Sequence, residues 1–118
     1  MSTINPTGKQ IKALANQPED TPFVMVNLLK FKPAPEGSES GEVRYNRYGA
    51  NIMPLLKQVG GRILWIGGVD QIFIGLPEDG WDRVMLVQYP SRKAFLRMIS
   101  MPEYQAIQKD REEGLYLI

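Results

Sequence analysis

The hydrophobic residues are grouped in short blocks along the chain, and the densest blocks predict β-strands. Three blocks are almost continuously apolar, which is typical of strands that are buried on both faces. These blocks are Phe23–Phe31, Arg62–Ile66 and Arg83–Tyr89. Leu115–Ile118 is also apolar and follows the helix-ending Gly114, so it predicts a short terminal strand.

The end of the second strand allows two interpretations. Gly67 and Gly68 follow the strand, and Gln71–Gly75 is again apolar. This segment either continues the strand, with the two glycines at a bulge, or folds back on it, with the glycines in a turn. The pair Asp79-Gly80 predicts a turn ahead of the third strand.

Apolar residues at helical spacing predict a short first helix and a long second one. The first covers Thr3–Gln17, with Asn5 as its N-cap, and the second covers Glu42–Val59. Pro54 lies inside the second helix and predicts a bend near Gly49. The apolar stripe of the long helix consists of Tyr45, Tyr48, Ile52, Leu55, Leu56 and Val59, and Gly60-Gly61 ends it.

Two capping signals predict further helical segments toward the C-terminus. Ser91 is the N-cap of a helix that contains Phe95 and Met98. Ser100 and Glu103 form an S-x-x-E capping box for a helix over Pro102–Glu112.

The order of these elements predicts an α+β fold. With the first helix set aside, strand, helix, strand, strand, helix and strand follow one another, which is the ferredoxin-like βαββαβ order. At 118 residues the chain has the size of one domain. We therefore divide it into an N-terminal helix and linker, residues 1–22, and a ferredoxin-like α/β-barrel domain, residues 23–118.

The strands also predict how the protein assembles. Both faces of Phe23–Phe31 and of Arg62–Ile66 are apolar, yet two helices cover only one face of such a sheet. A second copy of the same sheet would cover the other face, because two-fold homodimers are the commonest oligomers. The alternative is that the N-terminal helix folds over that face.

Composition and charge exclude several kinds of partner. The chain is 43% hydrophobic, and its 14 basic and 13 acidic residues give a net charge of +1. Because the charges are mixed along the chain, we expect no nucleic-acid partner. The longest apolar run, Phe23–Leu29, is too short to span a membrane, and Met1–Gln10 has no apolar core of a secretory signal. We therefore expect a cytoplasmic protein with no membrane partner.

The sequence contains neither Cys nor His. This excludes a thiolate nucleophile, a Cys-ligated metal centre, a histidine base, a haem held by histidine and a Ser-His-Asp triad. The carboxylates do not form an inward-facing pair with metal or glycosidase spacing. We therefore predict no cofactor and no metal, and any chemistry must rely on Tyr, Arg, Lys, Asn, carboxylates or the substrate itself.

Four motifs, in this order, resemble the domain-of-unknown-function 1330 family of the dimeric α/β-barrel superfamily. They are FVMVNLLKFKP, MPLLKQVGGRILWIG, WDRVMLVQYPS and SMPEYQAIQKDREEGL, and they run from about Phe23 to Leu115. The resemblance implies a ferredoxin-like protomer whose sheet closes against that of a second copy. Members often carry a His shortly before the Arg of the last motif, whereas Lys109 and Asp110 precede Arg111 here.

The superfamily includes cofactor-free monooxygenases, haem-degrading enzymes, lactone isomerases and non-enzymatic stress proteins. The resemblance to so mixed a group is a weak guide to function. Its haem-degrading members depend on a histidine ligand, which this chain lacks.

Asn27 is the most informative polar residue, because it interrupts an apolar strand on the face of Met25 and Leu29. An amide there needs hydrogen-bond partners. It could bind a carbonyl or enolate oxygen of a substrate, or it could bond the backbone at a bulge.

Tyr45 and Tyr48 are the other candidate catalytic residues. They lie three positions apart on the apolar face of the long helix, and each could donate a hydroxyl proton or simply belong to the core. For substrate binding the candidates are Trp65, Met25 and Phe23 as an apolar wall, with Arg62 as the cation for an anionic group.

These residues predict a small-molecule enzyme that needs no cofactor. Oxygenation or isomerisation of an enolisable or phenolic substrate would fit, because the substrate supplies the reactive carbanion. The alternative is a non-catalytic dimer that binds a metabolite or a partner protein. We expect a homodimer in either case, and a small organic molecule as the ligand of the enzyme or of the metabolite-binding dimer.

Overall fold

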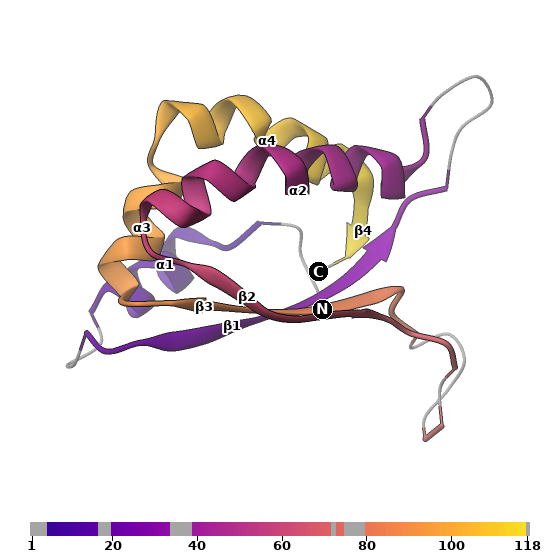
Figure 1. Ribbon diagram of the computed structural model, residues 1–118, viewed down its shortest axis with the longest axis horizontal. Coiled ribbons are helices and arrows are strands. Elements are labelled where there is room, and N and C mark those ends of the chain that lie inside the picture. Colours follow the sequence, from indigo (N-terminus) through magenta and orange to yellow (C-terminus); the bar gives the residue numbers. More distant parts are fainter. Residues whose placement is uncertain (1–4, 17–19, 34–38, 72, 75–79, 118) are drawn as a thin grey trace.

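The computed structural model describes residues 5–16, 20–33, 39–71, 73–74 and 80–117, which fold into a sheet with helices on one face (Figure 1). The fold class is mixed α+β, as predicted. The elements are α1 (Gly8–Ala15), β1 (Phe23–Phe31), α2 (Gly41–Gln58), β2 (Arg62–Gly68), β3 (Arg83–Tyr89), α3 (Arg92–Ile99), α4 (Pro102–Gly114) and β4 (Leu115–Leu117). The predicted bounds of β1 and β3 are confirmed.

The sheet has the strand order β2-β3-β1-β4, and all neighbouring strands are antiparallel. The pairing of β1 with β3 runs without a break from Phe23 opposite Tyr89 to Leu29 opposite Arg83. The short β4 reaches only the end of β1, at Lys30 and Phe31. The two central strands therefore place residues from distant parts of the sequence at the same end of the sheet.

The two glycines after the second predicted strand belong to the strand itself. Gly67 and Gly68 pair with Val84 and Arg83, so β2 is longer than predicted and no hairpin turn forms at these glycines. The register shifts instead between Ile63 and Trp65, which is where the irregularity lies. Within Gln71–Gly75, Gln71, Phe73 and Ile74 are not in a strand, and the rest of that segment, like Asp79, lies outside the described residues.

Local capping explains where two of the helices begin. Helix α1 is shorter than predicted because Thr7, not Asn5, is its N-cap, in a reciprocal capping box with Gln10. Helix α2 starts at Gly41 because the side chain of Ser40 accepts a hydrogen bond from the amide of Val43.

The predicted capping box of the last helix is wrong. Met101 is the N-cap of α4, without a side-chain cap, and the hydroxyl of Ser100 donates to the carbonyl oxygen of Leu96 in α3 instead. Ser100 is the C-cap of the preceding helix, so its position is fixed by α3. Pro102, which lacks an amide proton, occupies the first turn of α4, where no intrahelical partner is needed.

The hydrophobic core lies between the sheet and the helices α2, α3 and α4. Its most deeply buried side chains are Leu29, Met98 and Leu115, which come from β1, α3 and β4. Alternate residues of β1 and β3 face this layer, and partly buried Met25 and Met85 pack against it. Inward positions on these strands are therefore the ones that could contribute to a site under the helices.

The opposite face of the sheet is apolar and exposed. Val24 is 42% exposed, Val26 59% and Trp65 53%. Val26 and Trp65 both pair with Leu86, so the three side chains lie on the same face.

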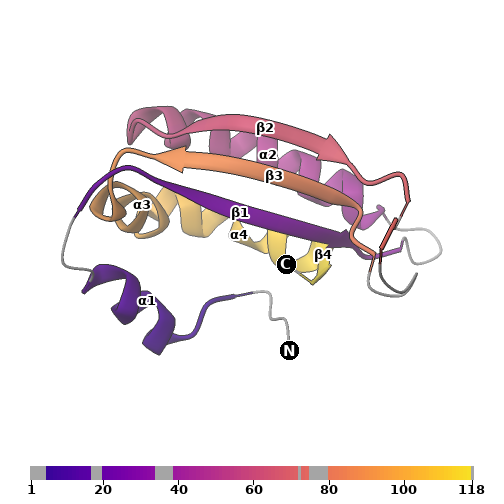
Figure 2. The ribbon, with the colours of Figure 1, turned by 90° about the horizontal axis from the view of Figure 1, so that it is seen from below.

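Helix α1 does not cover this face. It lies to the side, beyond the edge formed by β1 (Figure 2), and it contacts α3. The segment before it is held by hydrogen bonds that join Asn5 to Glu112 and Arg111 of α4. The alternative in which the N-terminal helix folds over the sheet is therefore wrong, and none of the helices described in the chain is long and apolar enough to cross a membrane.

Candidate functional site

The two tyrosines predicted as catalytic residues belong to an aromatic row inside the molecule. The ring centroid of Tyr45 is 5.7 Å from that of Phe31 and 5.4 Å from that of Tyr48. Tyr48 in turn meets Tyr104 of α4 edge to face, with the centroids 6.2 Å apart. All three tyrosines are buried, so the row joins the end of β1 to the interior between α2 and α4.

Burial is the main cause of the pKa shifts of Tyr45 and Tyr48. It raises the pKa of Tyr45 to about 12, although the nearby cations Arg111 and Arg83 act in the opposite direction. The pKa of Tyr48 is raised further, first by burial and then by Tyr104, to which its hydroxyl donates over 3.3 Å. Both hydroxyls are therefore protonated at neutral pH, where they can donate a hydrogen bond but cannot act as bases.

Asn27 lies on the inner face of β1, in regular pairing opposite Met85. Its amide Nδ2 donates to the carbonyl oxygen of Met25 over 3.4 Å, at the long end of hydrogen-bond distances. The side chain is partly buried, and the regular pairing means that no bulge occurs at this position. Asn27 therefore bonds its own strand without the bulge that the structural alternative assumed.

The four predicted substrate-binding residues do not lie together. Phe23 stacks on Tyr89 and meets Phe95 in the core, and Met25 also packs there. Trp65 and Arg62 lie on the outer face, where the guanidinium of Arg62 donates to the Oε1 of Gln88 over 3.0 Å. Trp65 is thus separated by the sheet from Asn27, Tyr45 and Tyr48, so these residues do not line one pocket within a protomer.

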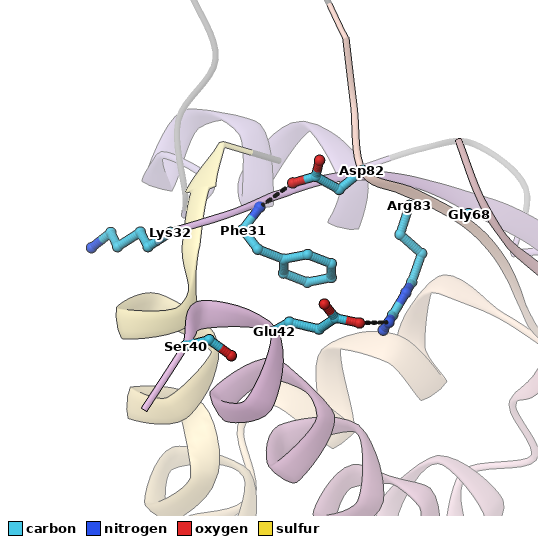
Figure 3. A pocket seen from close by; sticks show the side chains of 7 residues that line it. All are labelled: Phe31, Lys32, Ser40, Glu42, Gly68, Asp82 and Arg83. Atoms are coloured by element: carbon cyan, nitrogen blue, oxygen red, sulfur yellow. Dashed lines mark hydrogen bonds and ion pairs between the residues drawn. The ribbon is translucent and has the colours of Figure 1, made fainter. Parts of the chain in front are cut away.

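A pocket of about 390 Å³ lies at the end of the sheet where β1 stops and α2 and β3 begin (Figure 3). None of the predicted site residues lines it. It is bordered by Phe31, Lys32, Ser40, Glu42, Gly68, Asp82 and Arg83. The Phe31 ring stands between the Asp82 carboxylate on one side and Glu42 on the other, with Arg83 across from them.

Arg83 is the principal charged group of this pocket. Its guanidinium carbon is 4.9 Å from the centroid of the Phe31 ring, which is within cation–π distance. The Nη1 atom donates to the Oδ1 of Asn46 over 2.9 Å, and the Nη2 atom is 3.3 Å from the Oε1 of Glu42. The ring of Phe31, the amide of Asn46 and the carboxylate of Glu42 thus hold the guanidinium at the border of the pocket.

The remaining polar groups of the pocket are engaged in structure. Asp82 accepts a hydrogen bond of 2.8 Å from the amide of Phe31, and Ser40 caps α2. The side chain of Lys32 extends away from Arg83 (Figure 3). Its backbone joins two segments, because its amide donates to Gly114 and its carbonyl oxygen accepts from the amide of Gly41, both over 2.9 Å.

The position of Arg83 in the alternating pattern of its strand could have identified it as a site residue from the sequence. Arg83 has the same alternation as Met85, Val87 and Tyr89, so it lies on the inner face of β3. A cation at an inward position of a strand needs a specific environment. The partners Phe31 and Asn46 carry no such signal, because they approach Arg83 only through the tertiary fold.

The fold and the pocket define a small α+β protein with one sheet, one layer of helices and a polar pocket at the end of the sheet. The sequence matches the profile of the family described as domain of unknown function (DUF1330) over residues 40–116. The chain belongs to this family.

Two of the solved structures that this chain resembles are of a protein from Rhodopseudomonas palustris. The crystal structure of RPA0582, a protein of unknown function, has a TM-score of 0.89 and 29% sequence identity, covering 98% of this chain and 90% of that chain. The methylated RPA0582 protein has a TM-score of 0.88 and 30% identity, covering 97% of this chain and 87% of that chain. None of the curated proteins matches this sequence.

Proposed function

We propose that the protein is a ferredoxin-like homodimer of the dimeric α/β-barrel type. The strand order β2-β3-β1-β4, with helices on one face only, supports the ferredoxin-like arrangement. The exposed apolar face around Val26 and Trp65 supports dimerisation, because a patch of this kind marks an interaction surface. A second copy would bring the same face to it across a two-fold axis.

The function that the geometry supports best is the binding of a small organic anion with a flat apolar group. The observation that carries this proposal is Arg83, an inward-facing cation that lies over the Phe31 ring and borders the pocket. A guanidinium matches a carboxylate in charge and shape, and an aromatic ring beside it provides a surface for a planar group. A few polar groups in a concave, partly apolar site are typical of small-molecule binding.

Benzoate is a suitable first probe, with benzyl alcohol as its neutral counterpart. Isothermal titration with the intact protein should show that benzoate binds and that Arg83→Met weakens its binding at least tenfold, while benzyl alcohol is affected much less. Arg97→Met, at an exposed position of α3, is the matched control and should leave benzoate binding unchanged. Equal binding of benzoate to wild type and Arg83→Met would refute this site.

Enolisation of the ligand is the second candidate function, and the position of Tyr45 favours it. Tyr45 packs against the pocket residue Phe31, and the charge of Arg83 acts on its hydroxyl. Arg83 borders the pocket and the buried Tyr45 packs behind Phe31, so the guanidinium would contact an enolate oxygen directly and the protonated hydroxyl would add to its stabilisation without a cofactor. The carbon-bound proton of a readily enolised substrate would pass to a water molecule or hydroxide ion from the solvent.

Proton exchange provides the test of this second candidate. The protein should accelerate exchange of the benzylic protons of phenylpyruvate for deuterium, followed by NMR in D₂O, above the spontaneous rate. Tyr45→Phe should abolish the acceleration and leave phenylpyruvate binding intact, because only the hydroxyl is removed. If the wild-type protein binds phenylpyruvate without faster exchange, the protein is a binding module for this class of ligand.

A further inference from the structure

We infer that Glu42 is an internal competitor, whose carboxylate occupies the place on Arg83 that the carboxylate of a ligand takes when it binds. The inference rests on the proposed function, because it concerns the same pocket. Glu42 would then regulate binding, because the ligand must displace it from Arg83. The strength of the contact between Glu42 and Arg83 would set the affinity of the pocket for the ligand.

The three contacts of Arg83 differ in how easily they can be given up. Asn46 accepts a hydrogen bond from Nη1 over 2.9 Å, and the guanidinium lies over the Phe31 ring. The contact with Glu42 is longer, at 3.3 Å, and the side chain of Glu42 is 58% exposed whereas that of Arg83 is 19% exposed. An ion pair with a long contact and a solvent-exposed carboxylate is weakened by solvent screening. Glu42 can therefore leave while the other two contacts hold Arg83 in place.

The exchange replaces one carboxylate by another. The charge of Arg83 remains neutralised, so the ligand does not have to compensate a newly exposed cation. Glu42 stays in the first turn of α2 after its release, where a negative charge interacts favourably with the helix dipole. Much of its stabilising effect on the helix is thus kept in the bound state.

The other charged groups at the pocket do not compete in this way. Asp82 is bonded to the amide of Phe31 on the far side of the ring, and Lys32 extends away from Arg83 (Figure 3). Glu39 precedes α2 at the same end of the molecule, but it forms its ion pair with Arg47. Glu39 therefore provides a control with the same charge and a different partner.

Isothermal titration of benzoate into the intact protein tests the inference with Glu42→Gln and Glu39→Gln. Removing the competitor should tighten benzoate binding roughly two- to fivefold in Glu42→Gln, which is the range that a weak ion pair allows. Glu39→Gln should bind benzoate within about 1.5-fold of wild type, and neither variant should bind the neutral benzyl alcohol more tightly.

The outcomes separate this inference from the proposed function. If Glu42→Gln binds benzoate no more tightly than wild type while Arg83→Met loses binding, the pocket is confirmed and the competition is refuted. An equal gain in Glu42→Gln and Glu39→Gln also refutes the competition, because it shows a general charge effect. If Arg83→Met binds benzoate like wild type, or if no form binds it, the proposed site is wrong and the inference fails with it.

Discussion

The tyrosines in the interior show how residue-scale chemistry depends on surroundings. Tyr48 and Tyr104 place two hydroxyl groups in the buried core, where one hydrogen bond of 3.3 Å joins them. Removing one of the two hydroxyls would leave the other buried without a hydrogen-bond partner, which costs free energy of folding. These side chains therefore belong to the structure of the interior as well as to its chemistry.

Tyr48→Phe should lower the free energy of unfolding by about 1 kcal/mol, because it leaves the hydroxyl of Tyr104 without its donor. Tyr104→Phe should have a similar effect, and the double variant should be less destabilised than the sum of the two, since no unpaired group remains. Urea denaturation of the four proteins measures this. Strictly additive effects would mean that the two hydroxyls do not interact.

Alkaline pH should destabilise the protein through Tyr45. Its pKa is about 12 in the folded state and 10 in the unfolded chain, so the unfolded state loses its proton first. The stabilising contribution is complete below pH 10 and is lost as the pH rises toward 12, by up to about 1 kcal/mol per pH unit. Denaturant titrations at pH 9 to 11.5 should show a shallower decline for Tyr45→Phe. A decline identical to wild type would contradict the assignment to this residue.

At the scale of elements, the start of α2 and the end of α4 pack backbone against backbone. A Cβ on Gly41 would lie 2.3 Å from the carbonyl oxygen of Gly114 and 2.5 Å from the amide nitrogen of Lys32. Both contacts involve main-chain atoms, which cannot rotate away as a side chain would. Glycine is required at this position because the two hydrogen bonds through Lys32 need that close approach.

Gly41→Ala should therefore lower the free energy of unfolding by roughly 1–3 kcal/mol, as expected when a methyl group is forced into a packed site. Gly49→Ala in the same helix is the matched control. Its added methyl group meets nothing within 4 Å, so the higher helix propensity of Ala should stabilise the protein by up to about 1 kcal/mol. Thermal and urea denaturation compare the two, and equal changes in both variants would contradict this account.

How far the sequence predicts the elements depends on where the determining contacts lie. The bounds of β1 and β3 follow from local composition and are confirmed, and Ser91 caps α3 as predicted. The position of the irregularity in β2 could not be predicted from the sequence, because the register shift between Ile63 and Trp65 is fixed by pairing with β3. The site was harder still to predict, since both faces of the strands are apolar and the pattern does not say that Trp65 faces outward.

At the scale of the whole molecule, the outer face of the sheet is the feature that a second copy would complete. Val26→Lys should convert the proposed dimer into monomers, because it would place an unpaired charge in the middle of the interface. Sedimentation velocity at micromolar concentration measures the change, and the interface should bury roughly 1,600 Å² or more. Val43→Lys, at an exposed position of α2, should remain dimeric. A monomeric wild-type protein, or a dimeric Val26→Lys, would contradict the proposal.

The contact between Lys32 and Gly114 also determines the order in which the molecule can be assembled during synthesis. The chain leaves the ribosome from its N-terminus, and β1 must wait for β3 before it has a strand to pair with. The hydrogen bond from the amide of Lys32 to Gly114 waits longer still, because Gly114 ends α4, which follows β3 in the chain. Contacts between such distant residues also form slowly. The backbone of Lys32, which borders the pocket, is therefore fixed only once α4 has been made.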